Sequence, residues 1–300
     1  MLQIKNLSKN YGTKKAVCNL SLVVEDGDIM GFIGKNGAGK TTTLKACLGI
    51  IGISNGEILL DGTSVLKEPM VCKRKMAYVP DNPQLDEYMT GLQYLNFICD
   101  IYEVTSKNRK QNFERLTSAF QMEPYLNNLI SSYSHGMKQK LALIAAFSHT
   151  PKLLILDEPT TGLDPQTRLL IWDIIEKLRV EEKLTVFLTT HYMEEAANAG
   201  YVVILDKGSI VAEGTPFELK NEYVQDTMSV YGVTEEEIKT LGREYKKIRD
   251  GYQLKVKNTA EATRLIVEHQ EIFRDYEVVK GRMDDVFLAV TGKTLGGEHR

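Results

Sequence analysis

Cysteine is scarce in this 300-residue sequence, and the four that occur, Cys18, Cys47, Cys72 and Cys99, form no C-x-x-C pair. Such spacing argues against a zinc site or a disulfide framework and favours small buried thiols in a reducing compartment. Long apolar runs are also missing: no stretch reaches the roughly 18 to 20 residues that span a bilayer. The start, MLQIKN, lacks the apolar core of a signal peptide. We therefore expect a cytoplasmic protein.

Basic charge is not in excess, because 37 Lys and Arg face 40 Asp and Glu and leave a net charge of −3. A general nucleic-acid binder needs a basic face to displace counterions, so no nucleic-acid partner is expected. Hydrophobic residues make up 43% and charged residues 26%, which is ordinary for a globular protein. The length allows one main domain and a smaller second one.

A glycine-rich stretch at 34–42, GKNGAGKTT, fits the pattern G-x-x-x-x-G-K-[ST]. An apolar strand is predicted before it at 28–33 and a helix after it at 41–48, which is the context that a phosphate-binding loop requires. Backbone N–H groups and the helix N-terminus would surround the phosphates of a nucleotide. Lys40 would contact the β and γ phosphates, and the Thr41 hydroxyl would bind Mg²⁺. The predicted nucleotide-binding residues are Gly34, Asn36, Gly37, Ala38, Gly39, Lys40, Thr41 and Thr42.

A second acidic element follows the apolar run LLIL at 153–156. The run predicts a buried strand that delivers Asp157 to its carboxyl end, where ligands bind in open α/β sheets. Asp157 is the predicted Mg²⁺ carboxylate. The next residue, Glu158, is placed to polarise a water for attack on the γ-phosphate.

The order of elements predicts an α/β phosphate-loop domain over residues 1–222. Strands at 2–7 and 17–24 indicate an antiparallel part, and apolar residues at helical spacing over 92–129 indicate a helical insertion. We place the helical subdomain at about 85–150. The pattern restarts after 222, so residues 223–300 are predicted to form a small α+β accessory domain, whose role the pattern leaves open.

Five motifs in one order then resemble the ATP-binding cassette (ABC) ATPases over residues 1–222. They are the loop at 34–42, the segment SHGMKQK at 134–140, LLILDEP at 153–159, TGLD at 161–164 and His191. The resemblance implies that Glu158 is the general base and that His191 contacts the γ-phosphate. It also implies a head-to-tail dimer, homo- or heteromeric, in which two nucleotide domains enclose two ATP molecules. Asp164 would contact the second subunit, and the signature residues Ser134, His135, Gly136 and Met137 would close over the ATP of that subunit.

Tyr11 has two interpretations. The resemblance makes it the aromatic that stacks on adenine, since flat π surfaces bind bases with modest energy. It is equally compatible with an ordinary tyrosine at a sheet edge.

Two positions depart from the family pattern. Asp81 stands where glutamine is usual, so it would reach Mg²⁺ through water and would add negative charge near Glu158. His135 stands where glycine is usual. If that position needs a positive φ, a side chain costs about 1 to 2 kcal/mol there.

The end DDVFLAVTG at 284–292 resembles ATP-binding subunits of bacterial drug and antibiotic exporters whose membrane part is a separate polypeptide. An amphipathic helix packed on the accessory domain is the alternative for this segment. The resemblance implies an ATPase at the inner face of the cell membrane that drives transport through a separate permease. The alternative function is a soluble ABC ATPase in nucleic-acid or translation processes.

Overall fold

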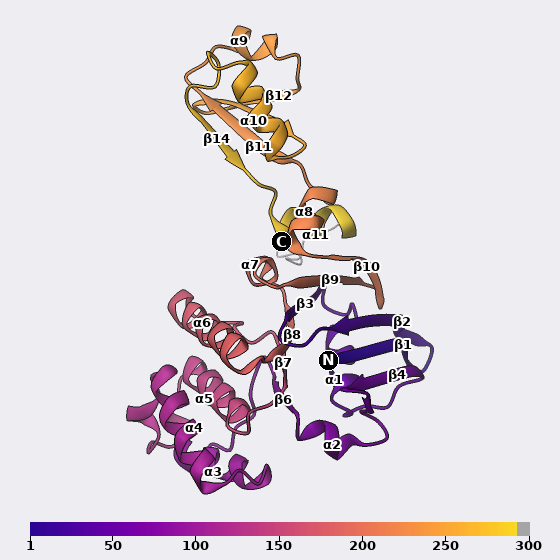
Figure 1. Cartoon of the computed structure of the whole chain (residues 1–300), viewed down its shortest axis with the longest axis vertical. Coiled ribbons are helices and arrows are strands. Elements are labelled where there is room, and N and C mark those ends of the chain that lie inside the picture. Colours follow the sequence, from indigo (N-terminus) through magenta and orange to yellow (C-terminus); the bar gives the residue numbers. More distant parts are fainter. Residues whose placement is uncertain (293–300) are drawn as a thin grey trace. The chain divides into compact units, whose positions relative to one another are not determined.

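The computed structural model describes residues 1–292. The chain divides into two compact units, which we describe separately (Figure 1). The first contains Met1–His191 and Ala199–Ile210, and the second contains Tyr192–Asn198 and Val211–Arg300. The domain division at 222 that the sequence pattern indicates stays a prediction.

The first unit contains the predicted antiparallel sheet. Its strand order is β2 (Lys14–Val24), β1 (Leu2–Tyr11), β4 (Asn55–Leu60) and β5 (Thr63–Ser64). β1 and β2 are longer than the sequence pattern predicts and pair as far as Tyr11 and Lys14. This extension brings Tyr11 to the turn between the two strands.

The parallel sheet of the first unit carries the carboxyl ends at which a site is expected. Its order is β9 (Tyr201–Asp206), β3 (Ile29–Gly34), β8 (Thr185–Thr190), β7 (Leu153–Asp157) and β6 (Met76–Val79), and β10 (Ser209–Gly214) begins beside β9. Every residue of β3, β7 and β8 is buried, as expected for parallel strands covered on both faces. The register pairs Asp157 with Thr189 and Ile33 with Thr190. The phosphate loop, Asp157 and the segment that leads to His191 therefore lie together at the carboxyl ends of these parallel strands.

Helices cover this sheet and form the predicted insertion. They are α1 (Lys40–Cys47), α2 (Pro69–Lys73), α3 (Gly91–Ile101), α4 (Ser106–Ala119), α5 (His135–Phe147) and α6 (Pro165–Glu182), with 3₁₀ turns η1 (Glu123–Tyr125) and η2 (Ile130–Ser132). Figure 1 shows α3, α4 and α5 together on one side of β6, with the antiparallel sheet on the other. The Asp164 side chain caps α6 by accepting from Thr167 N at 2.9 Å, and Pro165 follows it as the first helical residue.

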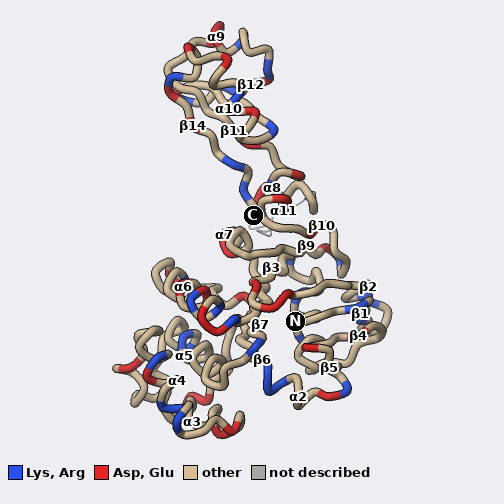
Figure 2. The backbone as a smooth tube through the Cα atoms, viewed as in Figure 1, with Lys and Arg blue, Asp and Glu red and all other residues tan. Residues whose placement is uncertain are grey.

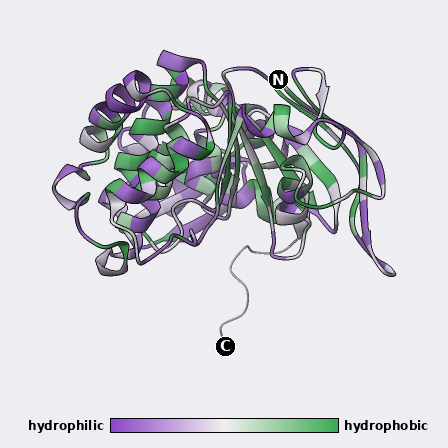
Figure 3. Cartoon of the chain, turned by 90° about the horizontal axis from the view of Figure 1, so that it is seen from below, coloured by the Kyte–Doolittle hydropathy of each residue, from purple (hydrophilic) through white to green (hydrophobic). Residues whose placement is uncertain are grey.

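The core of the first unit lies between α1 and the inner faces of both sheets. Its large buried side chains include Leu2, Ile4, Phe32, Leu44 and Phe187. Figure 3 shows hydrophobic residues along the inner sides of these elements and hydrophilic residues on outer helical turns. Basic and acidic residues are interspersed along the chain, with a basic stretch between α2 and β6 (Figure 2). No helix within residues 1–292 combines the length and apolar character needed to cross a membrane.

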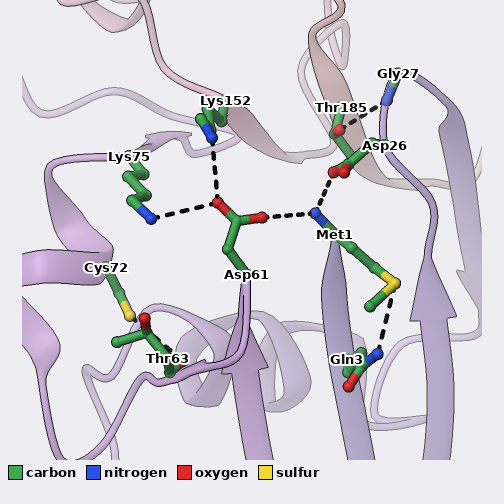
Figure 4. A network of polar contacts seen from close by, with 10 residues as sticks. All are labelled: Met1, Gln3, Asp26, Gly27, Asp61, Thr63, Cys72, Lys75, Lys152 and Thr185. Atoms are coloured by element: carbon green, nitrogen blue, oxygen red, sulfur yellow. Dashed lines mark hydrogen bonds and ion pairs between the residues drawn. The ribbon is translucent and has the colours of Figure 1, made fainter.

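Asp61 joins the two sheets of the first unit (Figure 4). It follows β4, and its Oδ2 lies 3.3 Å from Lys75 Nζ, just before β6, and 3.4 Å from Lys152 Nζ, just before β7. Its Oδ1 lies 3.0 Å from the Met1 amino nitrogen. Burial alone raises the pKa of the Asp61 carboxyl, but these amino groups outweigh it and lower the pKa to about 2.

The second unit has its own sheet and core. The antiparallel order is β12 (Tyr245–Ile248), β13 (Gly251–Val256), β11 (Asp226–Tyr231) and β14 (Tyr276–Val279). The helices are α7 (Met193–Ala197), α8 (Pro216–Tyr223), α9 (Glu235–Thr240), α10 (Thr259–Glu268) and α11 (Met283–Thr291). Capping boxes open α8 and α9. β12 was not predicted, because its four residues, YKKI, contain two lysines and too little apolar alternation.

Candidate functional site

The loop between β3 and α1 requires glycine at two places. A Cβ on Gly34 would lie 2.6 Å from the Leu205 carbonyl oxygen, and one on Gly39 would lie 2.6 Å from that of Ala16. Gly39 also has φ +112°, a conformation that side chains disfavour. The loop therefore approaches two neighbouring backbones closely and leads directly into α1.

A pocket opens over this loop. Of the predicted residues, Gly34 and Ala38 do not line the pocket. Those that do are Tyr11, Asn36, Gly37, Gly39, Lys40, Thr41, Thr42 and Glu158. Lys14, Ala16 and Lys35 also line the pocket and were missed by sequence reasoning. The lysines that follow Tyr11 were a usable signal, because a basic turn suits a phosphorylated ligand.

Lys40 is buried within the loop. Its Nζ donates to the Gly34 carbonyl oxygen at 2.7 Å and lies 3.8 Å from Glu158 Oε1. Burial lowers the pKa of Lys40, while the charges of Glu158 and Asp157 oppose that change. The loop thus presents a desolvated cation to the pocket.

Asp157 is 7% exposed at the end of β7. Burial raises the pKa of its carboxyl, and hydrogen bonds from the hydroxyls of Thr189 and Thr41 oppose this. Burial and the Asp157 and Asp81 charges also raise the pKa of Tyr78, on neighbouring β6, to about 12. The carboxylate therefore lies among three hydroxyl groups, of which only that of Thr41 was predicted.

Magnesium fits this arrangement only together with a nucleotide. Within the described residues, no three His, Cys, Asp or Glu side chains gather into a metal-binding group. Mg²⁺ is commonly held by one or two protein oxygens plus substrate phosphates, and the Thr41 hydroxyl hydrogen-bonded to Asp157 offers that donor set. Asp81 is exposed, and its carboxylate accepts from Asn82 N at 2.8 Å.

Glu158 lies between two other predicted catalytic groups. Its Oε2 is 3.0 Å from His191 Nδ1, and its Oε1 is the atom near Lys40. Its backbone has φ +50°, which is uncommon for a residue with a side chain. A carboxylate, an imidazole and an ammonium group thus meet at the loop.

The signature residues lie outside this pocket. Ser134 caps α5 by accepting from Met137 N at 3.3 Å, and His135 is the first helical residue. The possible strain at His135 is not incurred, because its φ is not positive. Its Nε2 instead lies 3.1 Å from the Thr161 carbonyl oxygen. Ser134, His135 and Asp164 are exposed, and the pocket lining within residues 1–292 contains none of them.

A second concave surface, which we name the α3–α5 groove, was not predicted. It is lined by Ala77, Tyr78, Pro80, Pro83, Gln84, Leu85, Tyr94, Ile98, Tyr102, Ala142, Ala145, Ala146 and His149. His149 stacks on Tyr102 with ring centroids 3.8 Å apart. The spacing of Tyr94, Ile98 and Tyr102, one helical turn apart, was an available signal for an apolar face on α3.

Comparisons with known proteins agree with this geometry. The family model described as ABC transporter matches residues 17–161. Nod factor export ATP-binding protein I of Cupriavidus metallidurans is 36% identical over 234 residues, which cover 77% of each chain. Linearmycin resistance ATP-binding protein LnrL of Bacillus subtilis is 31% identical over 98% of this chain and 99% of its own. A solved structure of an ATP binding subunit of ABC transporter superposes with a TM-score of 0.70 at 29% identity, over 74% of this chain and 93% of that one.

Proposed function

The chain belongs to the ABC transporter family of ATP-binding proteins, and from this premise we propose that it hydrolyses ATP to power export through a separate membrane subunit. The observation that carries the proposal is the meeting of Lys40, Glu158 and His191 beside the buried Asp157. These groups supply a cation for phosphate, a base for water and a carboxylate for a metal.

Each residue has a defined part in this proposal. The loop N–H groups and Lys40 bind the triphosphate, and Tyr11 at the pocket edge stacks on the base. Thr41 and Asp157 hold Mg²⁺, which when bound neutralises phosphate charge. Glu158 takes the proton of the attacking water. The 3.0 Å contact with His191 orients the Glu158 carboxylate toward the γ-phosphate position.

The site is completed by a second copy or a related chain. Ser134 and Asp164 are exposed and lie outside the pocket of their own chain, so they are available to another. We propose that 134–137 of one subunit contacts the ATP held by the other. Two nucleotides are then enclosed head to tail, and hydrolysis reopens the dimer.

The membrane partner is proposed to bind the α3–α5 groove. Tyrosine, proline and alanine side chains line it, which suits the apolar face of a short helix. One relative is named for Nod factor export and another for linearmycin resistance, and these names support export as the direction of transport. The chain would then work at the cytoplasmic face of the cell membrane. A soluble role in nucleic-acid or translation processes is not favoured by these relatives.

Affinity isolation of the tagged chain from detergent-solubilised native membranes tests this function. We expect an integral membrane protein to co-purify and Ile98→Glu, inside the groove, to abolish its recovery. Phe97→Glu is the matched control, because Phe97 is on the same helix, 47% exposed and outside the groove lining. Recovery of DNA or ribosomes without a membrane protein would instead favour the soluble alternative.

A further inference from the structure

The Thr189 hydroxyl forms hydrogen bonds with two consecutive acidic residues at once. It is fully buried at the end of β8, where it pairs in register with Asp157 of β7. Its Oγ1 donates to Asp157 Oδ1 at 2.5 Å and accepts from the backbone N–H of Glu158 at 3.2 Å. A single hydroxyl therefore connects the side chain of one acid to the backbone of the next.

We propose that Thr189 is a positioning residue for ATP hydrolysis, whose hydroxyl holds the Asp157 carboxylate and the Glu158 backbone in one arrangement. The inference rests on the proposed function, in which Asp157 binds Mg²⁺ and Glu158 acts as the base. Thr189 does not line the nucleotide pocket, so it acts through these neighbours and not on the substrate.

The Glu158 backbone gives the first reason. Its φ of +50° is sparsely populated by residues that carry a Cβ, so surrounding contacts must hold it. The Glu158 N–H donates both to the Thr189 carbonyl oxygen at 3.0 Å and to the Thr189 hydroxyl oxygen. This conformation accompanies the orientation of the Glu158 side chain toward His191 and Lys40.

The Asp157 carboxylate gives the second reason. A hydrogen bond to one carboxylate oxygen restricts its rotation about the bond to Cβ, so the carboxylate keeps one orientation toward Thr41. Groups that hold a metal ligand in this way commonly change metal affinity or activity by about 10- to 100-fold when removed.

Packing alone does not require a hydroxyl at this position. Thr189 lies on a strand whose residues are all buried, and valine has nearly the same shape as threonine. Valine would fill the same volume but would leave Asp157 Oδ1 without this donor. Thr189→Val therefore removes the proposed interaction with little change in packing.

The experiment compares three variants in the full chain. We expect Thr189→Val to lower kcat about 10- to 100-fold and to raise the Mg²⁺ concentration for half-maximal ATP binding, measured by calorimetry, by a similar factor. ATP binding in EDTA should be unchanged, and Thr189→Ser should restore both properties. Thr185→Val is the matched control: Thr185 is buried on the same strand, and its hydroxyl accepts from Gly27 N at 2.9 Å. It should lose thermal stability but keep the wild-type Mg²⁺ dependence.

Wild-type kcat and Mg²⁺ dependence in Thr189→Val would overturn the inference, as would equal effects of the two valine variants. If Thr189→Val is insoluble, Thr189→Ala against Thr189→Ser decides by the same readouts. A wild-type chain that does not hydrolyse ATP would refute the proposed function alone, because the Mg²⁺ dependence of nucleotide binding still tests Thr189.

Discussion

Glu158 Oε2 lies 3.0 Å from Nδ1 of His191, and the other carboxylate oxygen lies 3.8 Å from Lys40 Nζ. The three groups are the residue after β7, the residue after β8 and the first residue of α1. Because each group comes from a different element, each can be replaced alone and its role tested separately.

Replacing Glu158 by Gln removes the proposed base while keeping its size. We expect phosphate release to fall by about 10² to 10⁴-fold, because proton transfer to a positioned base contributes that much. ATP binding should persist, and size-exclusion chromatography in ATP should reveal a stable dimer. Glu181→Gln, at an exposed position of α6, is the control and should behave as wild type. Phosphate release near the wild-type rate in Glu158→Gln would refute the general-base role.

Replacing Lys40 by Ala removes the cation of the loop. We expect ATP affinity to fall about 10- to 100-fold, since hydrogen bonds to charged groups contribute about 1.5 to 3 kcal/mol. The thermal stability of the fold, unlike the ATP affinity, should not fall in this variant. Because the folded pKa of Lys40 is lowered, keeping it charged opposes folding at neutral pH, and the alanine variant should melt no lower than wild type. Lys45→Ala, exposed on the same helix, should leave ATP affinity unchanged, and equal affinities of both variants would contradict the assignment.

Replacing Asp81 by Gln restores the residue usual in the family and removes a charge close enough to raise the pKa of Asp157. A neutral amide attracts a divalent cation less strongly than a carboxylate. We expect the Mg²⁺ concentration for half-maximal ATPase activity to rise about 2- to 5-fold, which corresponds to the energy of an exposed charge pair. Superimposable Mg²⁺ curves would mean that Asp81 has no part in metal binding.

Replacing Asp61 by Asn breaks the connection between the two sheets of the first unit. The folded pKa is about 2, below the ordinary value of 3.8, so the ionised carboxylate stabilises the fold above about pH 4. This contribution is lost as the pH falls through 2. We expect the free energy of unfolding to fall by about 1 to 2 kcal/mol at pH 7 and the difference to shrink below pH 4. Urea unfolding at several pH values measures it. Asp173→Asn, an exposed acid of α6, is the control, and a pH-independent deficit in Asp61→Asn would contradict the ion-pair origin.

Much of the site was predictable because its signals are local. The glycines at 34 and 39 reflect close backbone approaches, and the run LLIL before Asp157 reflects a strand buried on both faces. Asp164 followed by Pro165 is a helix start that depends on neighbouring residues alone. Each of these signals acts within a few residues of the chain, so a pattern reports it directly.

Contacts between distant segments were not predictable. Thr189 meets Asp157 from 32 residues away because β7 and β8 are neighbours in one particular register, and a shift by one residue would turn the hydroxyl to the other face. The α3–α5 groove likewise exists only after two helices pack beside β6.

The sequence by itself therefore determined the nucleotide loop, the acidic strand end and the α/β class, because sterics, capping and hydrophobic periodicity act locally. The tertiary structure alone decided that His135 is helical and unstrained, that Asp61 joins two sheets and that one buried hydroxyl connects Asp157 to Glu158. These features depend on strand order and register, which long-range packing selects and no short segment encodes.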